Sequence, residues 1–353
     1  MRLKNWSIVL SVTVAMALTA CVGKATENTT NAQNETEKTE TTAEKSEADS
    51  AGPITIQHAF GETVINKKPE RIASIAWGNQ DTILALGVTP VGVSEANFGV
   101  DDGSGILPWT AEGFKKLGID NPVLFHDTDG IDYEAISDVQ PDVILAAYSG
   151  ITQEQYDLLS EIAPVVAYPQ KAWQTSWREQ ILLDSEGMGM KTEGETLVRD
   201  LETLIEDKKS AYPQIKGKTG AFFYVNASDL GKFYVYLPAD PRASYLTDLG
   251  LKFPESVSNL SKDSDTFSIT ISAENADALN DIDVIVAYGS KDLLPALQAD
   301  PLLGTIPAVA RGSVVLIDSG TPLAASGTPS ALSIPATIDE YLKLIGEAAD
   351  KVQ

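Results

Sequence analysis

The chain has 353 residues, and its 50 acidic and 26 basic side chains give a formal net charge of −24. Nucleic-acid affinity comes from basic patches on phosphate, so this balance argues against a nucleic-acid partner. The single cysteine excludes disulfides within the chain and thiolate metal clusters. The length left after the N-terminal segments described next fits one large or two medium domains.

The first 21 residues predict an export signal. Arg2 and Lys4 form a positive n-region, and 8–17 form an apolar h-region that is too short for a comfortable transmembrane helix. The segment Leu18-Thr19-Ala20-Cys21 resembles the bacterial lipobox, in which the cysteine is lipidated and becomes the mature N-terminus. Because the only cysteine stands here, we expect a lipidated Cys21 rather than an ordinary cleaved signal followed by an incidental cysteine.

Residues 22–52 predict a disordered acidic tether. They contain seven Thr and six Glu and no aromatic residue. Such a segment cannot bury enough apolar surface to offset its ordering entropy. As a flexible coil it would average roughly 30 Å end to end, enough to lift a domain from a surface.

The remaining chain alternates strand and helix patterns, which favours parallel sheets with helices on both faces. The N-terminal lobe, 53–173, is predicted to contain a hairpin over 54–65, a strand over 71–76, a helix over 79–86, a strand over 90–94, a Gly/Asp-rich loop over 96–108, a short helix over 132–139, a buried strand over 142–148, a helix over 152–162 and a strand over 164–168.

The pattern then changes to helical spacing over 174–211. It predicts one long helix, or two abutting helices with a joint at Gly187 and Gly189, that bridges two lobes. The C-terminal lobe, 212–353, is predicted to contain strands over 219–226 and 232–237, a helix over 241–249, an irregular stretch over 253–265, a strand ending at 288, a helix over 292–298, a strand over 313–318 and a helix over 334–349.

Two stretches, 140 residues apart, are almost alike. In each, a glutamate opens a short helical pattern and an apolar strand ends in tyrosine 14 residues later, from Glu134 to Tyr148 and from Glu274 to Tyr288. Ligands of parallel sheets bind at the carboxyl ends of the strands. We therefore expect both tyrosines to face a cleft and both glutamates to stand beside it. The alternatives are a favourable helix-dipole position for each glutamate and core packing for each tyrosine.

Several short motifs together resemble one family, the solute-binding lipoproteins of iron–siderophore ABC importers, in the helical-backbone class that includes vitamin B12 binders and enterobactin binders. The motifs are Lys68-Pro69-Glu70-Arg71-Ile72, Leu84-Ala85-Leu86-Gly87-Val88, Pro141-Asp142-Val143-Ile144, Gly250, Asp300-Pro301-Leu302-Leu303 and Ile306-Pro307-Ala308-Val309. Each motif alone is weak evidence for the family, but the order and spacing of all of them over 53–353 are specific to it.

The resemblance implies an α/β fold of two Rossmann-like lobes joined by a long rigid helix, with the ligand cleft between the lobes. It implies a membrane-anchored, extracytoplasmic monomer that binds an iron(III)–siderophore as transported ligand, has no intrinsic cofactor and performs no covalent chemistry. It further implies that Glu134 and Glu274 pair with arginines of the permease. The long tether favours a Gram-positive surface over a periplasm.

A bulky, often anionic ferric chelate requires flat aromatic walls and guanidinium donors. The candidate ligand-binding residues are Trp77, Phe98, Trp109, Tyr148, Trp173, Arg178, Tyr236, Arg242 and Tyr288. For Arg178 the alternative is an ion pair with Glu179 or Asp184 on its own helix.

Other functions are open. With only His58 and His126, a His-rich zinc or manganese site lacks its ligands. Haem would need an axial ligand, which Tyr148 or Tyr288 could supply, so a haem, cobalamin or cobinamide binder is the alternative. A rival of another class is an anchored hydrolase, although we find no catalytic base for it. The siderophore class (catecholate, hydroxamate or citrate-like) and the permease are left undetermined.

Overall fold

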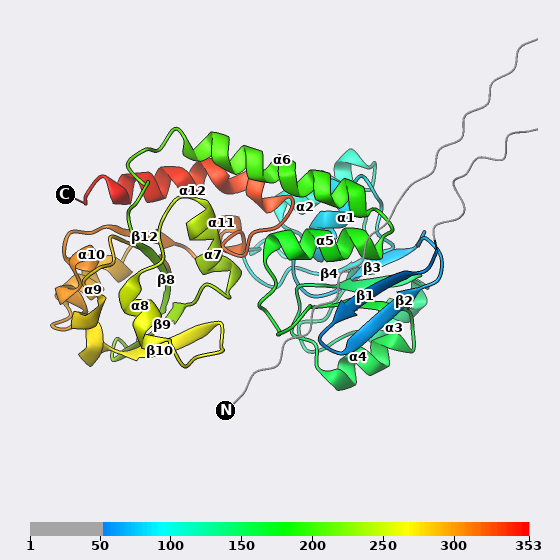
Figure 1. Ribbon diagram of the computed structural model, residues 1–353, viewed down its shortest axis with the longest axis horizontal. Coiled ribbons are helices and arrows are strands. Elements are labelled where there is room, and N and C mark those ends of the chain that lie inside the picture. The colour runs from blue at the N-terminus through cyan, green and yellow to red at the C-terminus, as the bar shows by residue number, and fades with distance from the viewer. Residues whose placement is uncertain (1–51, 353) are drawn as a thin grey trace, which may run out of the picture. The chain divides into compact units, whose positions relative to one another are not determined.

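The computed structural model describes residues 52–352 (Figure 1). The predicted export signal, the lipidation site Cys21 and positions 22–51 of the predicted tether lie outside the described residues. Within the described part, no helix has both the length and the apolar character needed to cross a membrane.

The N-terminal lobe is built on a five-stranded sheet whose strands are all parallel. Its order is β5-β4-β3-β6-β7, with β3 (Ile72–Ser74), β4 (Gly92–Ser94), β5 (Leu124–Phe125), β6 (Val143–Ala146) and β7 (Val165–Ala167). An antiparallel hairpin precedes it, formed by β1 (Ile54–His58) and β2 (Gly61–Ile65). Four of the five sheet strands are buried at every residue, as is typical of a parallel sheet covered on both faces.

Helices cover this sheet on both sides. They are α1 (Asn79–Ala85), α2 (Pro108–Lys116), α3 (Tyr133–Asp138) and α4 (Gln153–Ser160). Leu145 of β6 packs in one cluster with Ile83 of α1, whereas its neighbour Ile144 packs in another with Leu159 of α4. Successive strand residues point to opposite faces, so α1 and α4 lie on opposite sides of the sheet.

The C-terminal lobe has a mixed sheet of order β10-β9-β8-β11-β12, with β8 (Gly220–Val225), β9 (Lys232–Tyr236), β10 (Ser268–Ser272), β11 (Val284–Tyr288) and β12 (Val314–Ile317). The predicted fold class is confirmed with one correction. Strands β8, β11 and β12 are parallel, but β9 pairs antiparallel with both of its neighbours, β8 and β10. Only six residues, 226–231, join β8 to β9, and a parallel crossover needs about a dozen or more.

The helices of this lobe are mostly short, and the last is the longest. They are α7 (Pro241–Asp248), α8 (Glu255–Leu260), η1 (Ala273–Leu279), α9 (Leu293–Ala299), η2 (Leu303–Thr305), α10 (Pro307–Ala310), α11 (Pro322–Ala325) and α12 (Ser333–Ala349). In α12, Ile334, Ile338, Leu342 and Ile345 are fully buried at helical spacing. Helix α8 lies in a stretch predicted to be irregular.

The predicted bridge over 174–211 consists of two helices, α5 (Trp177–Gly187) and α6 (Lys191–Lys209). They turn at Gly189, whose φ of +67° favours glycine, and then lie side by side instead of continuing in line. A Cβ on Gly194 of α6 would lie 1.9 Å from Ser185 Oγ of α5, so only glycine allows this close approach. Consequently α6 alone, with 19 residues, runs from one lobe to the other (Figure 1).

One apolar cluster extends through the bridge into the C-terminal lobe. It contains Trp177 of α5, Leu201 of α6, Ile338 of α12 and Val286 of β11. This core attaches α5 and α6 to the C-terminal lobe, and Leu183 of α5 packs against the N-terminal cluster of Ile83 and Leu145, so both lobes hold the bridge.

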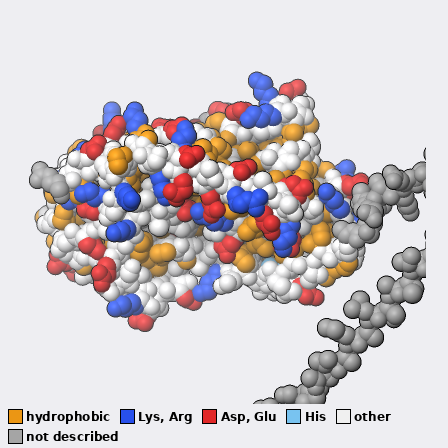
Figure 2. Space-filling view, turned by 45° about the horizontal axis from the view of Figure 1, so that its top comes forward, with side chains coloured by type: hydrophobic (Ala, Val, Ile, Leu, Met, Phe, Trp, Pro, Cys, Tyr) orange, Lys and Arg blue, Asp and Glu red, His pale blue; other side chains and the backbone are white. Residues whose placement is uncertain are grey.

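Charged side chains of both signs are interspersed over the face that carries α6 and α12 (Figure 2). Lys208 of α6 pairs with Asp339 of α12 at 2.6 Å, and Arg178 of α5 pairs with Glu202 of α6 at 2.6 Å and with Asp248 of α7 at 2.9 Å. Exposed ion pairs contribute only about 0–1 kcal/mol each. The shared apolar core therefore fixes the bridge more than these pairs do.

Candidate functional site

A cavity of about 310 Å³ lies where the carboxyl ends of β6 and β11 meet. These two strands occupy the same fourth position in their sheets, and each leads into one of the repeated tyrosines. Six of the nine predicted ligand-binding residues line the cavity: Trp77, Phe98, Tyr148, Trp173, Arg242 and Tyr288. The sequence repeat therefore corresponds to two equivalent positions that face one cavity.

A buried amide holds the strand ends of the N-terminal lobe together. Asn79 Nδ2 donates to the carbonyl oxygens of Ile75 at 2.8 Å and Tyr148 at 3.2 Å, and its Oδ1 accepts from the Tyr148 N–H at 3.1 Å. Gln180 Nε2 of α5 donates to Asn79 Oδ1 and to the Trp77 carbonyl, both at 2.9 Å. This network positions the segment that carries Trp77 and Tyr148.

Trp173 stands in a conformation that is costly for a bulky residue. Its φ is +61°, and its N–H donates to the Ser149 carbonyl at 3.0 Å. Its ring meets the Tyr148 ring edge-on at 5.3 Å, and a Cβ on Gly150 would lie 2.2 Å from its Nε1. A strained backbone costs about 1–3 kcal/mol and persists only where its surroundings fix it. The structure thus fixes Trp173 at the cavity, with 36% of its surface exposed.

An aromatic contact between the two lobes also lines the cavity. Phe98 of the N-terminal lobe meets Tyr288 of the C-terminal lobe edge-on at 5.6 Å, and the Tyr288 hydroxyl donates to the Ala324 carbonyl at 3.2 Å. Burial raises the pKa of Tyr288 to about 12, although nearby Arg242 opposes the shift. Burial likewise raises the pKa of Tyr148. Both phenols are therefore neutral at neutral pH.

Arg242 supplies the cation of the cavity from the first turn of α7. Its Nε and Nη2 donate to Asp240 Oδ1 and Oδ2 at 2.8 and 2.7 Å, and its guanidinium lies 4.1 Å from the centre of the Tyr236 ring. Burial alone would lower the pKa of Arg242, but its hydrogen bonds to Asp240 and the charge of that carboxylate raise it. Asp240 accepts two of the five guanidinium N–H groups, which leaves the others for a ligand.

Two predicted ligand-binding residues, Tyr236 and Arg178, do not line the cavity. Tyr236 supports the guanidinium of Arg242 from one side. Arg178 of α5 pairs with Glu202 of α6 and Asp248 of α7. The partners considered on its own helix, Glu179 and Asp184, do not bind it. The carboxylates of α6 and α7 satisfy the guanidinium away from the cavity.

Trp109 also lies outside the cavity, where it serves a buried carboxylate. Its Nε1 donates to Asp81 Oδ2 at 3.0 Å, Thr110 Oγ1 donates to Oδ1 at 2.8 Å, and the Ser330 hydroxyl donates to Oδ2. Ser330 precedes α12, so Asp81 of α1 connects segments 249 residues apart. Burial raises the pKa of Asp81 to about 6, and the three hydrogen bonds oppose that shift.

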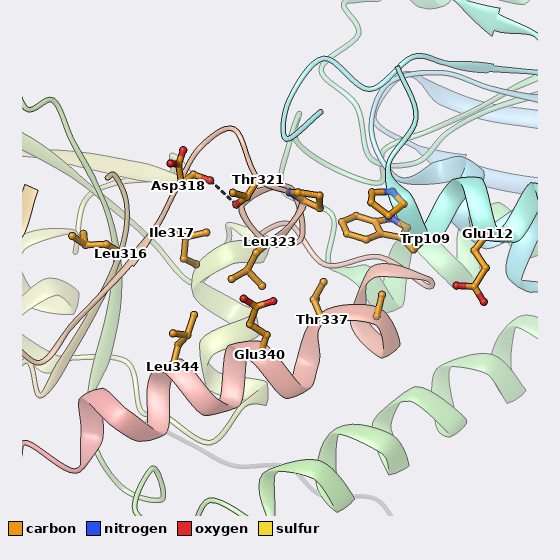
Figure 3. A pocket seen from close by; sticks show the side chains of 13 residues that line it. Trp109, Glu112, Leu316, Ile317, Asp318, Thr321, Leu323, Thr337, Glu340 and Leu344 are labelled. Atoms are coloured by element: carbon orange, nitrogen blue, oxygen red, sulfur yellow. Dashed lines mark hydrogen bonds between the residues drawn. The ribbon is translucent and has the colours of Figure 1, made fainter. Parts of the chain in front are cut away.

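A larger cavity, of about 550 Å³, lies beside Trp109 between α2, α12 and the loop after β12 (Figure 3). Its ionisable side chains are all acidic, namely Glu112, Asp318 and Glu340, and Trp109 is its one aromatic residue. By contrast, the cavity at the strand ends has six aromatic side chains and an arginine. Its chemistry, rather than its volume, makes it the candidate site for a chelate.

The repeated glutamates lie at equivalent places on the surface. Glu134 is in the first turn of α3, which precedes β6, and Glu274 is in the first turn of η1, which precedes β11. Both side chains are exposed. Asp132 and Ser272 cap these helices by accepting backbone N–H groups. Each lobe therefore presents one carboxylate at the same topological position.

The model of the periplasmic binding protein family matches residues 72–321. The chain belongs to this family. Among solved structures, this periplasmic binding protein is similar to PiaA of Streptococcus pneumoniae in complex with ferrichrome, with 52% identity and a TM-score of 0.82. That match covers 85% of this chain and 100% of the other.

Two curated relatives are more distant. The probable siderophore-binding lipoprotein YfiY of Bacillus subtilis is 26% identical over 246 residues, which cover 69% of this chain and 70% of the relative. The Fe(3+) dicitrate-binding periplasmic protein FecB of Escherichia coli is 26% identical over 291 residues, which cover 76% and 86%.

Four cavity residues were not predicted from the sequence of this periplasmic binding protein: Asn97, Phe267, Ala325 and Thr328. All but one come from loops, and Ala325 ends the four-residue helix α11. Phe267 follows the stretch 253–265, which was predicted to be irregular. Only its aromatic ring indicated that it could line a binding cavity. The others carry no periodicity or motif that indicates a cavity.

The buried Asp81 predicts a specific pH dependence of stability. Its folded pKa of about 6 exceeds its ordinary 3.8, so between these values the folded state binds more protons than the unfolded state. Stability should therefore fall as pH rises from about 4 to 6, by at most about 3 kcal/mol from this group. Asp81→Asn should remove this contribution, as measured by thermal unfolding at several pH values.

The matched control is Asp138→Asn, which changes an exposed aspartate at the end of α3. Its profile should run parallel to that of the wild type. A profile of Asp81→Asn that also stays parallel to the wild type would contradict the raised pKa.

Proposed function

We propose that this periplasmic binding protein captures a ferric siderophore in the 310 Å³ cavity and delivers it to the permease of an ABC importer. The observation that carries the proposal is the cavity wall of six aromatic side chains around Arg242. Aromatic faces pack on the bulky surface of a chelate, and guanidinium N–H groups donate to its oxygen atoms. The ferrichrome complex of the 52% identical PiaA supports this reading.

The alternative ligands gain less support from the same cavity. A haem iron would take an axial tyrosinate, but burial raises the pKa of Tyr148 and Tyr288. A hydrolase would need a base, but His58 bonds to Thr63 in the hairpin, His126 bonds to Glu95, and neither lines the cavity. We therefore propose binding without covalent chemistry.

Trp173 provides the test of the binding site. Trp173→Ala removes a ring that the strained backbone holds at the cavity, so the affinity for ferrichrome should fall at least about tenfold, or 1.4 kcal/mol. Isothermal titration calorimetry on the full chain in mild detergent measures it without a tryptophan reporter. Haem and cobalamin are titrated in parallel.

Tyr224→Ala is the control, because Tyr224 is an exposed aromatic residue on β8 that does not line the cavity. Its affinity for ferrichrome should equal that of the wild type. An unchanged affinity of Trp173→Ala for ferrichrome would show that this cavity is not the binding site. Saturable binding of haem or cobalamin, without binding of ferrichrome, would identify that compound as the ligand in place of a siderophore.

We further propose that Glu134 and Glu274 dock the two lobes on arginines of the permease. Each exposed pair would contribute about 0–1 kcal/mol, so two such pairs mainly set orientation. The double variant Glu134→Ala/Glu274→Ala should abolish iron uptake by cells, because neither lobe can then align with the permease. Its affinity for ferrichrome should stay unchanged.

Glu154 and Glu255 offer a matched control, because both are exposed glutamates in the first turn of a helix, one in each lobe. Glu154→Ala/Glu255→Ala should take up iron normally. Lost ligand affinity in the Glu134/Glu274 variant, or an equal loss of uptake in the control, would refute the docking assignment.

We also propose that Cys21 carries a lipid anchor on the extracytoplasmic face of the membrane, with a Gram-positive surface favoured. The lipobox-like segment before Cys21 supports this, as does the lipoprotein relative from Bacillus subtilis. Cys21→Ser should release the protein from the membrane fraction, which cell fractionation measures. Retention of the variant in that fraction would refute lipid anchoring.

A further inference from the structure

The candidate cavity has one ionised side chain on its wall, and a buried group behind it carries the opposite charge. Among the residues that line the cavity, Arg242 is the only one with a charged side chain. Asp240 lies directly behind it, has no exposed surface, and binds the guanidinium through both carboxylate oxygens at 2.8 and 2.7 Å. The wall and its support therefore carry no net charge.

Asp240 has a second role that does not require its charge. Its Oδ1 accepts the Arg242 N–H at 2.8 Å and thereby caps the start of α7. Asparagine caps helices about as well as aspartate does. What only aspartate adds is a negative charge, and a buried carboxylate is costly unless a cation neutralises it. The pair therefore acts as one neutral unit, with Tyr236 stacked on its guanidinium.

Two further basic side chains, in the segment 171–178 that contains Trp173, are paired with carboxylates as well. Lys171, two residues before Trp173, binds Asp265 of the other lobe at 2.8 Å. Arg178 binds Glu202 and Asp248. Neither of these two cations is left unpaired for an anionic ligand.

We propose that Asp240 is a specificity-determining residue: by neutralising Arg242 it makes the cavity select uncharged ferric chelates over anionic ones. The proposal rests on the proposed siderophore function. Three hydroxamates, each with one negative charge, balance ferric iron, whereas three catecholates leave the complex a trianion. An anion loses more hydration free energy on leaving water than a neutral chelate does, and here it meets N–H donors without a net positive charge to offset that larger cost.

The test compares one neutral and one anionic chelate. Dissociation constants for ferrichrome, a ferric trihydroxamate, and ferric enterobactin, a ferric triscatecholate, are measured by calorimetry on the full chain in mild detergent. The wild type should bind ferrichrome more tightly. Asp240→Asn keeps the helix cap but leaves Arg242 unneutralised, so it should shift the ratio of the two constants at least about tenfold toward ferric enterobactin.

Asp283→Asn is the matched control. Asp283 lies in the same lobe, accepts the Thr219 N–H at 2.9 Å and pairs with Arg311 at 3.8 Å, away from the cavity. Asp283→Asn changes the net charge of the chain by the same amount as Asp240→Asn does. The ratio of its two dissociation constants should therefore stay within about twofold of the wild-type ratio. An equal shift in this control would assign the effect to overall charge and overturn the role of Asp240.

The double variant Asp240→Asn/Arg242→Gln tests the same idea even if Asp240→Asn does not fold. It removes both charges, so it should keep the wild-type ratio although both affinities fall. Selective loss of ferric enterobactin in this variant would mean that Arg242 acts as a net positive charge in the wild type, which overturns the proposal.

The outcomes separate this proposal from the function on which it rests. A wild-type chain that binds neither chelate overturns the siderophore function, and the proposal with it. Wild-type binding of ferrichrome together with an unchanged ratio in folded Asp240→Asn overturns only the selectivity role, and leaves Asp240 as a helix cap.

Discussion

The arrangement of the site depends on the apolar core that the bridge shares with the C-terminal lobe. Trp177 of α5 and Leu201 of α6 pack in the same cluster as Ile338 of α12 and Val286 of β11. At about 25 cal/mol per Å², exposing even ~200 Å² of this surface would cost about 5 kcal/mol. Leu183 of α5 also packs against the N-terminal cluster of Ile83 and Leu145. Wide separation of the lobes would expose apolar surface at one of these contacts, so the cavity is largely formed before a ligand arrives. Binding then spends little free energy on closure.

Within that frame, buried polar groups fix the individual walls. Asn79 joins the ends of β3 and β6, and Gln180 ties them to α5, so Tyr148 is held by the same helix pair that forms the bridge. Asp81 and Ser330 connect α1 to the segment before α12. The strained backbone of Trp173 is held by its N–H bond to the Ser149 carbonyl and by the contact of its ring with Tyr148. These hydrogen bonds and ring contacts favour one arrangement of the aromatic walls.

Local patterns in the sequence predict the parts of the site that lie on regular elements. Tyr148 and Tyr288 could be predicted because each follows an apolar strand, and strand ends of parallel sheets meet at one edge. Trp109 and Arg178 could not be placed, because distant partners such as Asp81, and the carboxylates of α6 and α7, decide their orientation. Loop residues such as Asn97, Phe267 and Thr328 carry no periodic signal at all. The antiparallel β8–β9 pair was predictable from its short connection alone.

Charge acts on this protein at two length scales. The chain carries a net charge of −24, but interactions between exposed charges are largely screened beyond about 8 Å at physiological ionic strength. Long-range repulsion therefore discriminates poorly between chelates, whereas groups inside the cavity are screened much less. There, the Arg242 guanidinium keeps its hydrogen-bond donors while Asp240 removes its net charge. A neutral oxygen-rich ligand can use those donors without the desolvation cost of an ion, so the pair separates hydrogen bonding from charge attraction.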